Sequence, residues 1–261
     1  GFVITILFWV VLGAAGAVPF ILGESPSMTV IDSLFESFSG LTTTGSTVLV
    51  GLDSMPRSIL YYRQQLQWLG GMGIVVLAVA ILPMLGVGGM QLYRAEMPGP
   101  LKDSKLSPRI AETAKALWII YVVLTIACAG SYWLAGMTPF DAIGHAFSTV
   151  AIGGFSTHDG SIGHFDSVGI ELVAIIFMLI AGMNFSLHFV AWHSRRVRHY
   201  LADPEWRTYL GFVGIIAVII SLALIEQNVY GVSDSIRKGF FQSVSIATTT
   251  GFSTDNFSVW P

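Results

Sequence analysis

The sequence predicts an all-α membrane protein built from repeated units, each made of a membrane span, a short re-entrant helix with its loop, and a second span. Three observations lead to this prediction. The 261 residues are 53% hydrophobic and only 11% charged, whereas soluble domains carry about 25% charged residues. Five apolar runs are long enough to cross a bilayer. A short glycine-containing segment also occurs three times, each time beyond a long apolar run.

The five apolar runs reach the length of about 20 residues that a helix needs to cross the hydrocarbon core of a bilayer. Each run is therefore expected to form one membrane-spanning helix. The runs cover residues 2–22, the stretch between Arg63 and Arg94, and residues 116–138, 172–192 and 209–225.

Three shorter segments, residues 31–42, 139–150 and 235–247, lie between the long runs. Each has about a dozen residues, which is too short to span, and each follows a turn signal such as Pro26 or Gly231. We predict that they are re-entrant half-helices. Irregular backbone at membrane depth is tolerated only where it is buried in protein or lines a watery cavity. Three such hairpins therefore indicate a pore or a binding site rather than an anchor.

The repeated segment places a polar turn with a glycine at the end of each half-helix, at Gly45, Gly154 and Gly251. Glycine takes positive φ without steric cost, so each turn can aim carbonyl oxygens at a common axis, where they replace the hydration shell of an ion. Glycine with Ser and Thr is also typical of helix-packing faces, but three copies after three half-helices favour an ion filter.

The charge around these turns favours a monovalent cation. The C-terminal end of a half-helix carries about half a negative charge, and none of the three turns contains a basic residue. These features do not separate potassium from sodium or ammonium.

The order of segments divides the chain into three units, residues 1–109, 110–204 and 205–261, of which the third holds only an outer span, a half-helix and a turn. A pore has to close around an axis, and two and a half units cannot enclose one. We therefore expect the chain to be a fragment, truncated at its N-terminus and lacking at least one and a half further units. A partner subunit that closes the ring is the weaker alternative.

Basic residues predict the orientation in the membrane. Two loops, residues 94–115 and 195–207, hold nine of the thirteen lysines and arginines. Such loops face the cytoplasm. The half-helices are then expected to enter from the outer side.

Four segments carry more specific motifs: Gly40 to Thr47, Gln67 to Ile74, Ala151 to Asp159, and Ser245 to Phe252. With them the sequence resembles the TrkH family of bacterial potassium-uptake subunits, within the Trk/Ktr/HKT superfamily. In that family four non-identical units of one chain surround a pore, as in potassium channels. The resemblance implies that this chain covers about two and a half of the four units.

The resemblance also implies which backbone carbonyls coordinate potassium. In plant members a serine at the first filter glycine accompanies sodium preference, so Gly45 favours potassium. The second turn departs from the Thr-rich pattern at Ala151 and Ile152, which keeps the carbonyls but removes side-chain hydroxyl ligands. The implied filter residues are Thr43, Thr44, Gly45, Ile152, Gly153, Gly154, Thr249, Thr250 and Gly251.

Glu36, His145 and Gln242 share one half-helix position, nine residues before the filter glycine. We predict that they bond to the filter backbone and hold its shape. Capping and packing of the half-helix is the alternative role for the same three side chains.

The expected function is a potassium-translocating pore subunit of a bacterial inner-membrane uptake system. It would work by selective permeation, with K⁺ as substrate, without a cofactor and without being an enzyme. By resemblance, a cytosolic nucleotide-binding subunit of the TrkA type would regulate it, and two copies would form a homodimer in the lipid bilayer. Its basic residues are confined to local clusters, so no nucleic-acid partner is expected.

Two alternatives stay open. The first keeps the architecture but changes the ion to sodium or ammonium. The second is a membrane-embedded protease that uses His188, His193 and Glu171. The sequence contains no Walker motif and no other nucleophile–base arrangement that would favour an enzyme.

Overall fold

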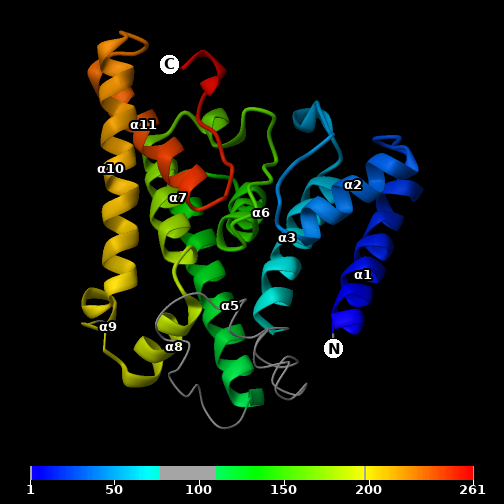
Figure 1. Ribbon diagram of the computed structural model, residues 1–261. Helices are drawn as coiled ribbons and strands as arrows, with labels where there is room; N and C mark the ends of the chain where they lie inside the picture. Colours follow the sequence, from blue (N-terminus) through cyan, green and yellow to red (C-terminus); the bar gives the residue numbers. More distant parts are fainter. Residues whose placement is uncertain (1, 77–109, 197, 261) are drawn as a thin grey trace.

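The computed structural model describes residues 2–76, 110–196 and 198–260, and every regular element in these ranges is a helix (Figure 1). The all-α prediction is confirmed. The helices are α1 (Phe2–Leu22), α2 (Val30–Leu41), η1 (Leu52–Ser54), α3 (Arg57–Val76), α5 (Ile110–Leu134), α6 (Pro139–Val150), η5 (Ser161–Phe165), α7 (Val168–Ala181), α8 (Phe185–Ser194), α9 (Arg198–Ala202), α10 (Pro204–Glu226), α11 (Val232–Ala247) and η6 (Phe257–Val259).

The first unit contains two long helices, α1 and α3, with the short helix α2 between them (Figure 1). The helix α1 has the bounds that the apolar run predicts. The Thr29 hydroxyl caps α2 by accepting a hydrogen bond from the Asp32 backbone N–H at 3.1 Å, which satisfies one of the free donors at the helix start. Residues 77–94, the second part of the second predicted span, lie outside the described residues, as do Arg94, Lys102, Lys105 and Arg109.

The second unit repeats this arrangement with α5, α6 and α7. Thr138 caps α6 as Thr29 caps α2, because its hydroxyl accepts from the Asp141 N–H at 3.2 Å. Pro139 stands in the first turn, where a missing N–H costs nothing. The half-helix therefore has the predicted bounds, residues 139–150, while the span before it is shifted to Ile110–Leu134.

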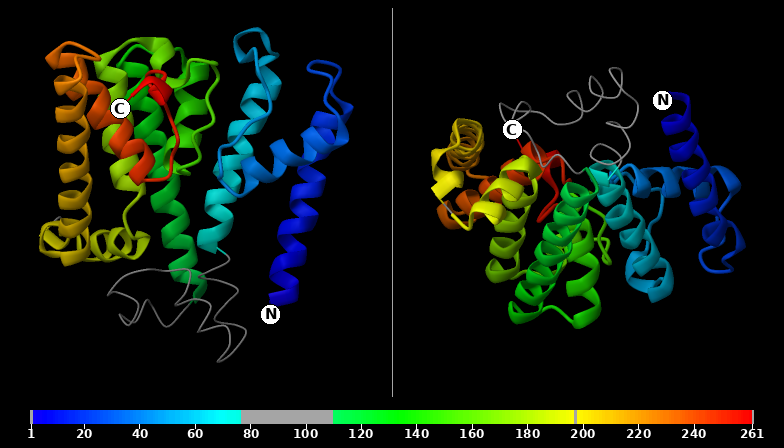
Figure 2. Two further views of the ribbon diagram at one scale, coloured as in Figure 1. Left: turned by 45° about the horizontal axis from the view of Figure 1, so that its top comes forward. Right: turned by 90° about the horizontal axis from the view of Figure 1, so that it is seen from below.

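The prediction of one continuous span over residues 172–192 is wrong. The helix α7 ends at Ala181 with Gly182 as its C-cap, and α8 begins at Phe185. His188 in α8 stabilises the break, since its Nε2 lies 3.0 Å from the carbonyl oxygen of Ile180 at the end of α7. The left view of Figure 2 shows α8 lying crosswise to α7 rather than continuing it.

The third unit consists of α10 and α11, followed by the turn and η6. The Asp203 side chain caps α10, accepting from the Trp206 N–H at 2.8 Å. The third half-helix begins at Val232, three residues before the predicted start, and Gly231 stands at its N-cap. From below, the three units lie side by side in chain order (Figure 2, right).

The distribution of exposed and buried apolar side chains is that of a membrane protein. Two described helices, Ala114–Leu134 and Pro204–Glu226, are long and apolar enough to cross a bilayer, and only 33% and 22% of their most apolar windows are buried. The core helix of a soluble protein would be mostly buried, whereas Phe212, Ile215 and Ile219 of α10 are exposed. The buried core lies instead between α5, α6, α7 and α11, and includes Tyr132, Met178, Phe241 and Phe252.

Candidate functional site

The first half-helix ends in a left-handed turn. Thr43 has a φ of 56°, and its N–H donates to the Gly40 carbonyl at 3.0 Å. The next N–H, that of Thr44, reaches back to the Ser39 carbonyl at 2.9 Å. These two bonds form the Schellman arrangement that satisfies the last carbonyls of a helix. Gly45 follows with a φ of 78°, so two residues of the turn have positive φ.

The other two turns repeat this geometry although their sequences differ. Ile152 and Gly154 have φ values of 54° and 75°, and Thr249 and Gly251 have values of 63° and 83°. The Gly153 N–H donates to the Ser148 carbonyl at 2.8 Å, as Thr44 does to Ser39. Positive φ is unusual for a β-branched residue such as Ile152 or Thr249, and it persists only where the surroundings enforce it.

The three turns lie next to one another in chain order. A Cβ added to Gly45 would overlap the carbonyl oxygen of Gly153, and a Cβ added to Gly154 would overlap that of Thr250. At these two positions glycine therefore serves two purposes. It adopts a positive φ, and its lack of a Cβ lets the backbone of one turn approach the backbone of the next. The first turn thus lies against the second, and the second against the third, rather than facing away from one another.

This arrangement can bind a partly dehydrated cation. Backbone carbonyl oxygens come from three chain segments, and the negative C-terminal ends of α2, α6 and α11 point toward the turns (Figure 1). No basic side chain belongs to any of the three turns.

The repeated serine braces the chain beyond the glycine in two of the units. Ser39 Oγ donates to the Ser46 carbonyl at 2.5 Å, and Ser245 Oγ donates to the Phe252 carbonyl at 2.7 Å. In the second unit the equivalent carbonyl, that of Phe155, accepts from Gln64 Nε2 at 3.2 Å instead. The Ser148 hydroxyl has no hydrogen-bond partner among the described residues.

Glu36 contacts the chain that follows the first turn. Its carboxylate accepts from Thr47 Oγ1 at 2.9 Å and from the Val48 N–H at 3.2 Å. Arg63 Nε donates to the same carboxylate at 2.5 Å, and both side chains of this ion pair are completely buried. A buried charge needs a partner of this kind, because desolvation would otherwise cost several kcal/mol.

The helix α3 of the first unit also reaches the turn of the second. Gln67 Nε2 donates to the Gly153 carbonyl at 2.6 Å, and its Oε1 accepts from the Phe155 N–H at 3.1 Å. The Arg63 guanidinium stacks over the Phe155 ring at 4.3 Å. No sequence argument assigned a role to Arg63 or Gln67 at the turns. The sequence did contain a signal for them, because Arg63 and Gln67 are polar residues one helical turn apart at the start of an apolar run. Polar side chains inside membrane segments usually mark functional positions.

His145 and Gln242 occupy the same half-helix position as Glu36, and both are buried. His145 Nδ1 lies 2.9 Å from the Asp141 carbonyl, and its Nε2 lies 2.9 Å from Ser156 Oγ, beyond the second turn. Because a carbonyl only accepts, Nδ1 carries the proton and Nε2 accepts from the serine.

The three residues of the protease alternative do not form a common site. Glu171, at the start of α7, pairs with Arg237 at 2.7 Å. His188 follows the far end of the same helix, about 15 Å away along the axis, and bonds to Tyr200 and Ile180. His193 stacks on Phe189. The geometry therefore gives no catalytic arrangement of these side chains.

Comparison with known proteins gives consistent matches along the whole chain. The chain is 62% identical over 262 residues to the Trk system potassium uptake protein TrkH of Escherichia coli (strain K12), covering 100% of this chain and 54% of that protein. It is 44% identical over 261 residues to the Trk system potassium uptake protein TrkG of the same strain, with coverage of 100% and 54%. The crystal structure of the potassium transporter TrkH from Vibrio parahaemolyticus matches with a TM-score of 0.87 and 53% sequence identity, covering 100% of this chain and 53% of that one.

The chain thus spans about half the length of the relatives that it matches. The TrkH family model, described as a cation transport protein, matches residues 1–261. The chain belongs to the TrkH family of cation transport proteins.

Proposed function

We propose that this chain forms part of a potassium-translocating pore subunit of a bacterial inner-membrane uptake system. The observation that carries the proposal is the approach of the three turns, Gly45 against the Gly153 carbonyl and Gly154 against the Thr250 carbonyl. Potassium is favoured as the ion because the relatives that match the whole chain at 62% and 44% identity are potassium uptake proteins.

The proposed filter consists of the carbonyls of the three turns. Paired positive-φ residues at equivalent positions support this assignment, because they orient successive carbonyls in the same way in every unit. The filter residues are Thr43, Thr44, Gly45, Ile152, Gly153, Gly154, Thr249, Thr250 and Gly251.

Five buried side chains would hold this filter in shape. Glu36 and His145 act within their own units, and their hydrogen bonds beyond the turns support this role. Arg63 and Gln67 join the first unit to the second. For Gln242 the support is its burial at the equivalent position.

The membrane potential can drive uptake through such a filter without a cofactor. An inward monovalent cation gains about 2.3 kcal/mol per 100 mV, which corresponds to roughly fifty-fold accumulation. We further propose that the full-length protein forms a homodimer regulated by a cytosolic nucleotide-binding subunit of the TrkA type. The basic segment around α8 and α9, with Arg195, Arg196 and Arg198, offers a surface for such a partner.

Ion competition tests the proposal. The full-length protein is reconstituted in vesicles, and ⁸⁶Rb⁺ uptake is measured against external K⁺, Na⁺ and NH₄⁺. Potassium should compete strongly and sodium weakly. Equal competition by sodium or ammonium would support the alternative ion instead, and absence of any potential-driven flux would overturn the pore assignment.

A further inference from the structure

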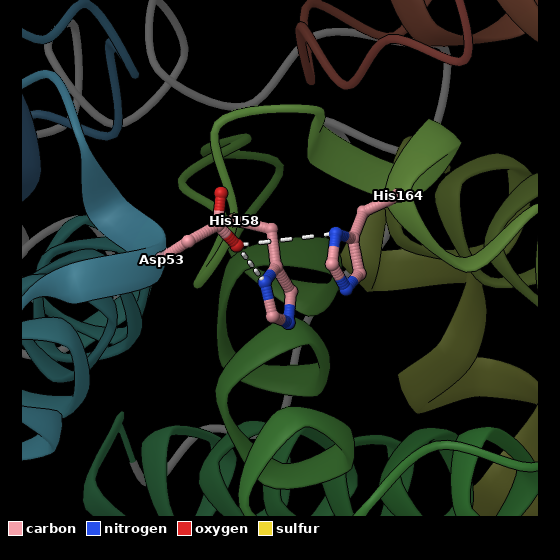
Figure 3. Close-up of side chains that lie close together, drawn as sticks. All are labelled: Asp53, His158 and His164. Atoms are coloured by element: carbon pink, nitrogen blue, oxygen red, sulfur yellow. Dashed lines mark hydrogen bonds and ion pairs between the residues drawn. The ribbon is translucent and has the colours of Figure 1, made fainter.

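Three side chains that could ligate a metal come together in the loops beyond the first two turns. Asp53 lies in η1, His158 follows the second turn, and His164 lies in η5. The Asp53 carboxylate lies 2.5 Å from His158 Nδ1 and 3.9 Å from His164 Nδ1. Figure 3 shows both imidazoles turning their Nδ1 edge toward this carboxylate. One ligand atom from each residue lies within 4.8 Å of the other two.

We propose that Asp53, His158 and His164 form a binding site for a divalent transition-metal ion, with Zn²⁺ as the representative species. Two imidazole nitrogens and one carboxylate oxygen are a ligand set that suits Zn²⁺ and its neighbours Co²⁺ and Ni²⁺. Three protein ligands leave the fourth tetrahedral position for water. The ligands of this site are side chains, whereas the proposed filter uses backbone carbonyls of the turns.

The spacing of the ligands is close to what a metal requires. Bonds of about 2.0–2.1 Å in a tetrahedron separate ligand atoms by about 3.3 Å, between the two distances of 2.5 and 3.9 Å to Asp53. The metal would replace the proton between His158 and Asp53. The two rings are stacked in parallel at 3.6 Å, so they must splay apart to aim at one ion. His164 can rotate because its side chain is 44% exposed.

A further carboxylate supports the orientation of His158. Asp141 lies 3.4 Å from the Nε2 atom of that ring, on the side away from Asp53. A carboxylate on the second ring nitrogen fixes a ligating histidine and increases its basicity. Asp141 is itself held by Thr157 at 2.7 Å.

The site is accessible and carries a charged ligand. The Asp53 side chain is 49% exposed, and His164 borders a cleft of about 450 Å³ that Asp159 and Asp255 also line. The Asp53 carboxylate accepts a hydrogen bond from His158 Nδ1 at 2.5 Å, and a carboxylate oxygen is one of the ligand types that Zn²⁺ binds. A bound ion would join a loop of the first unit to a loop of the second.

Metal titration of the untagged full-length protein tests the site. Chelator-treated protein in detergent is titrated with Zn²⁺ by calorimetry and with Co²⁺ by visible absorption. The wild type should bind with the bands of a tetrahedral Co²⁺ site, and His164→Ala and Asp53→Asn should each weaken Zn²⁺ affinity at least about tenfold. His193→Ala, an exposed histidine in α8, serves as the matched control and should bind as the wild type does.

A purely structural role gives a different result. In that case Asp53→Asn lowers the melting temperature, while wild-type protein shows no saturable metal binding, and the proposal is overturned. Unchanged affinity in both His164→Ala and Asp53→Asn would overturn it as well. His164→Ala is the decisive variant, because the exposed side chain can be removed without leaving a buried gap. Binding is the readout, so the result does not depend on which ion the pore conducts.

Discussion

At Gly154 the backbone has a φ of 75°, and an added Cβ would overlap the Thr250 carbonyl oxygen. Two separate constraints, one local and one between units, therefore apply to the same residue. Gly45 is under the same two constraints against Gly153. Other glycines of the chain, such as Gly214 in α10, have open space around them and no unusual φ.

Gly154→Ala should abolish most ⁸⁶Rb⁺ uptake in vesicles. Left-handed backbone costs an alanine roughly 1–2 kcal/mol, and the overlap with a backbone carbonyl adds to this cost. Since about 1.4 kcal/mol corresponds to a factor of ten, uptake should fall at least about tenfold. Gly214→Ala is the matched control, expected to leave uptake unchanged. Wild-type uptake in Gly154→Ala would contradict the proposed filter.

Glu36→Gln should destabilise the protein strongly, because it leaves Arg63 as a buried charge without its carboxylate. Breaking one side of a buried ion pair costs about 3–5 kcal/mol. We expect a large drop in melting temperature in detergent for Glu36→Gln and for Arg63→Met. The double variant should recover part of the loss, since no unpaired charge remains. Arg57→Met, at the exposed start of α3, is the control; a drop of equal size there would argue against the pair.

At the scale of elements, the three half-helices end with the same backbone hydrogen-bonding pattern. They differ in the hydrogen bond made by the serine that lies six residues before the glycine of each turn. Ser39 and Ser245 donate to the carbonyl that follows the glycine. Ser148 does not, and the equivalent carbonyl of Phe155 accepts a hydrogen bond from Gln64 of α3 instead. The ends of α2 and α11 are therefore braced within their own unit, and the end of α6 is braced by its neighbour.

This difference predicts unequal effects of three equivalent substitutions. Ser39→Ala and Ser245→Ala each remove a hydrogen bond worth about 1 kcal/mol, which should lower the melting temperature by the order of 2 °C. Ser148→Ala removes no bond seen in the described residues and should be close to neutral. Thermal unfolding of the three variants in one detergent provides the measurement. A loss in Ser148→Ala as large as in the other two would contradict this interpretation.

The break between α7 and α8 is also an element-scale feature. The fourteen residues of α7 extend about 21 Å, less than the hydrocarbon thickness of about 30 Å. Gly182 is the C-cap of α7, and the Tyr209 hydroxyl of α10 lies 2.8 Å from where a Cβ of this residue would be. Gly182 and Asn184 are residue types that often follow the end of a helix. The apolar run that contains them has the length of a full span, so length alone predicted one continuous helix.

At the scale of the whole molecule, the units are linked through bonds that cross from one unit to the next. Gln67 of the first unit bonds to both Gly153 and Phe155 of the second. The second unit is also linked to the third. The Gly163 N–H of the second unit donates to the carbonyl of Ser253, which follows the third turn, at 3.0 Å. A change in one unit is therefore expected to affect the turn of another.

Gln67→Leu should lower ion selectivity although the residue lies outside the turns. It leaves the Gly153 carbonyl and the Phe155 N–H without their partner, and one hydrogen bond of about 1 kcal/mol corresponds to roughly fivefold. Sodium should then inhibit ⁸⁶Rb⁺ uptake at concentrations about fivefold lower than in the wild type. Gln65→Leu, on the same helix and only partly buried, is the control. Unchanged selectivity in Gln67→Leu would remove this residue from the proposed filter support.

The sequence alone determined the membrane class, three of the five spans in outline, and the three half-helices. These features depend on local properties: the length of apolar runs, the capping residues Thr29 and Thr138, and the preference of glycine for positive φ. Residues such as Gly45 and Gly251 could be singled out because the same local pattern recurs in each unit.

Only the tertiary structure decided which groups meet. Arg63 pairs with Glu36, Gln67 bonds to the next unit, and Asp53 lies beside two histidines more than a hundred positions later. No local pattern encodes these contacts, because they depend on how three units pack side by side. The same packing places Tyr209 and His188 at the break between α7 and α8, where the length of the apolar run had predicted one continuous helix.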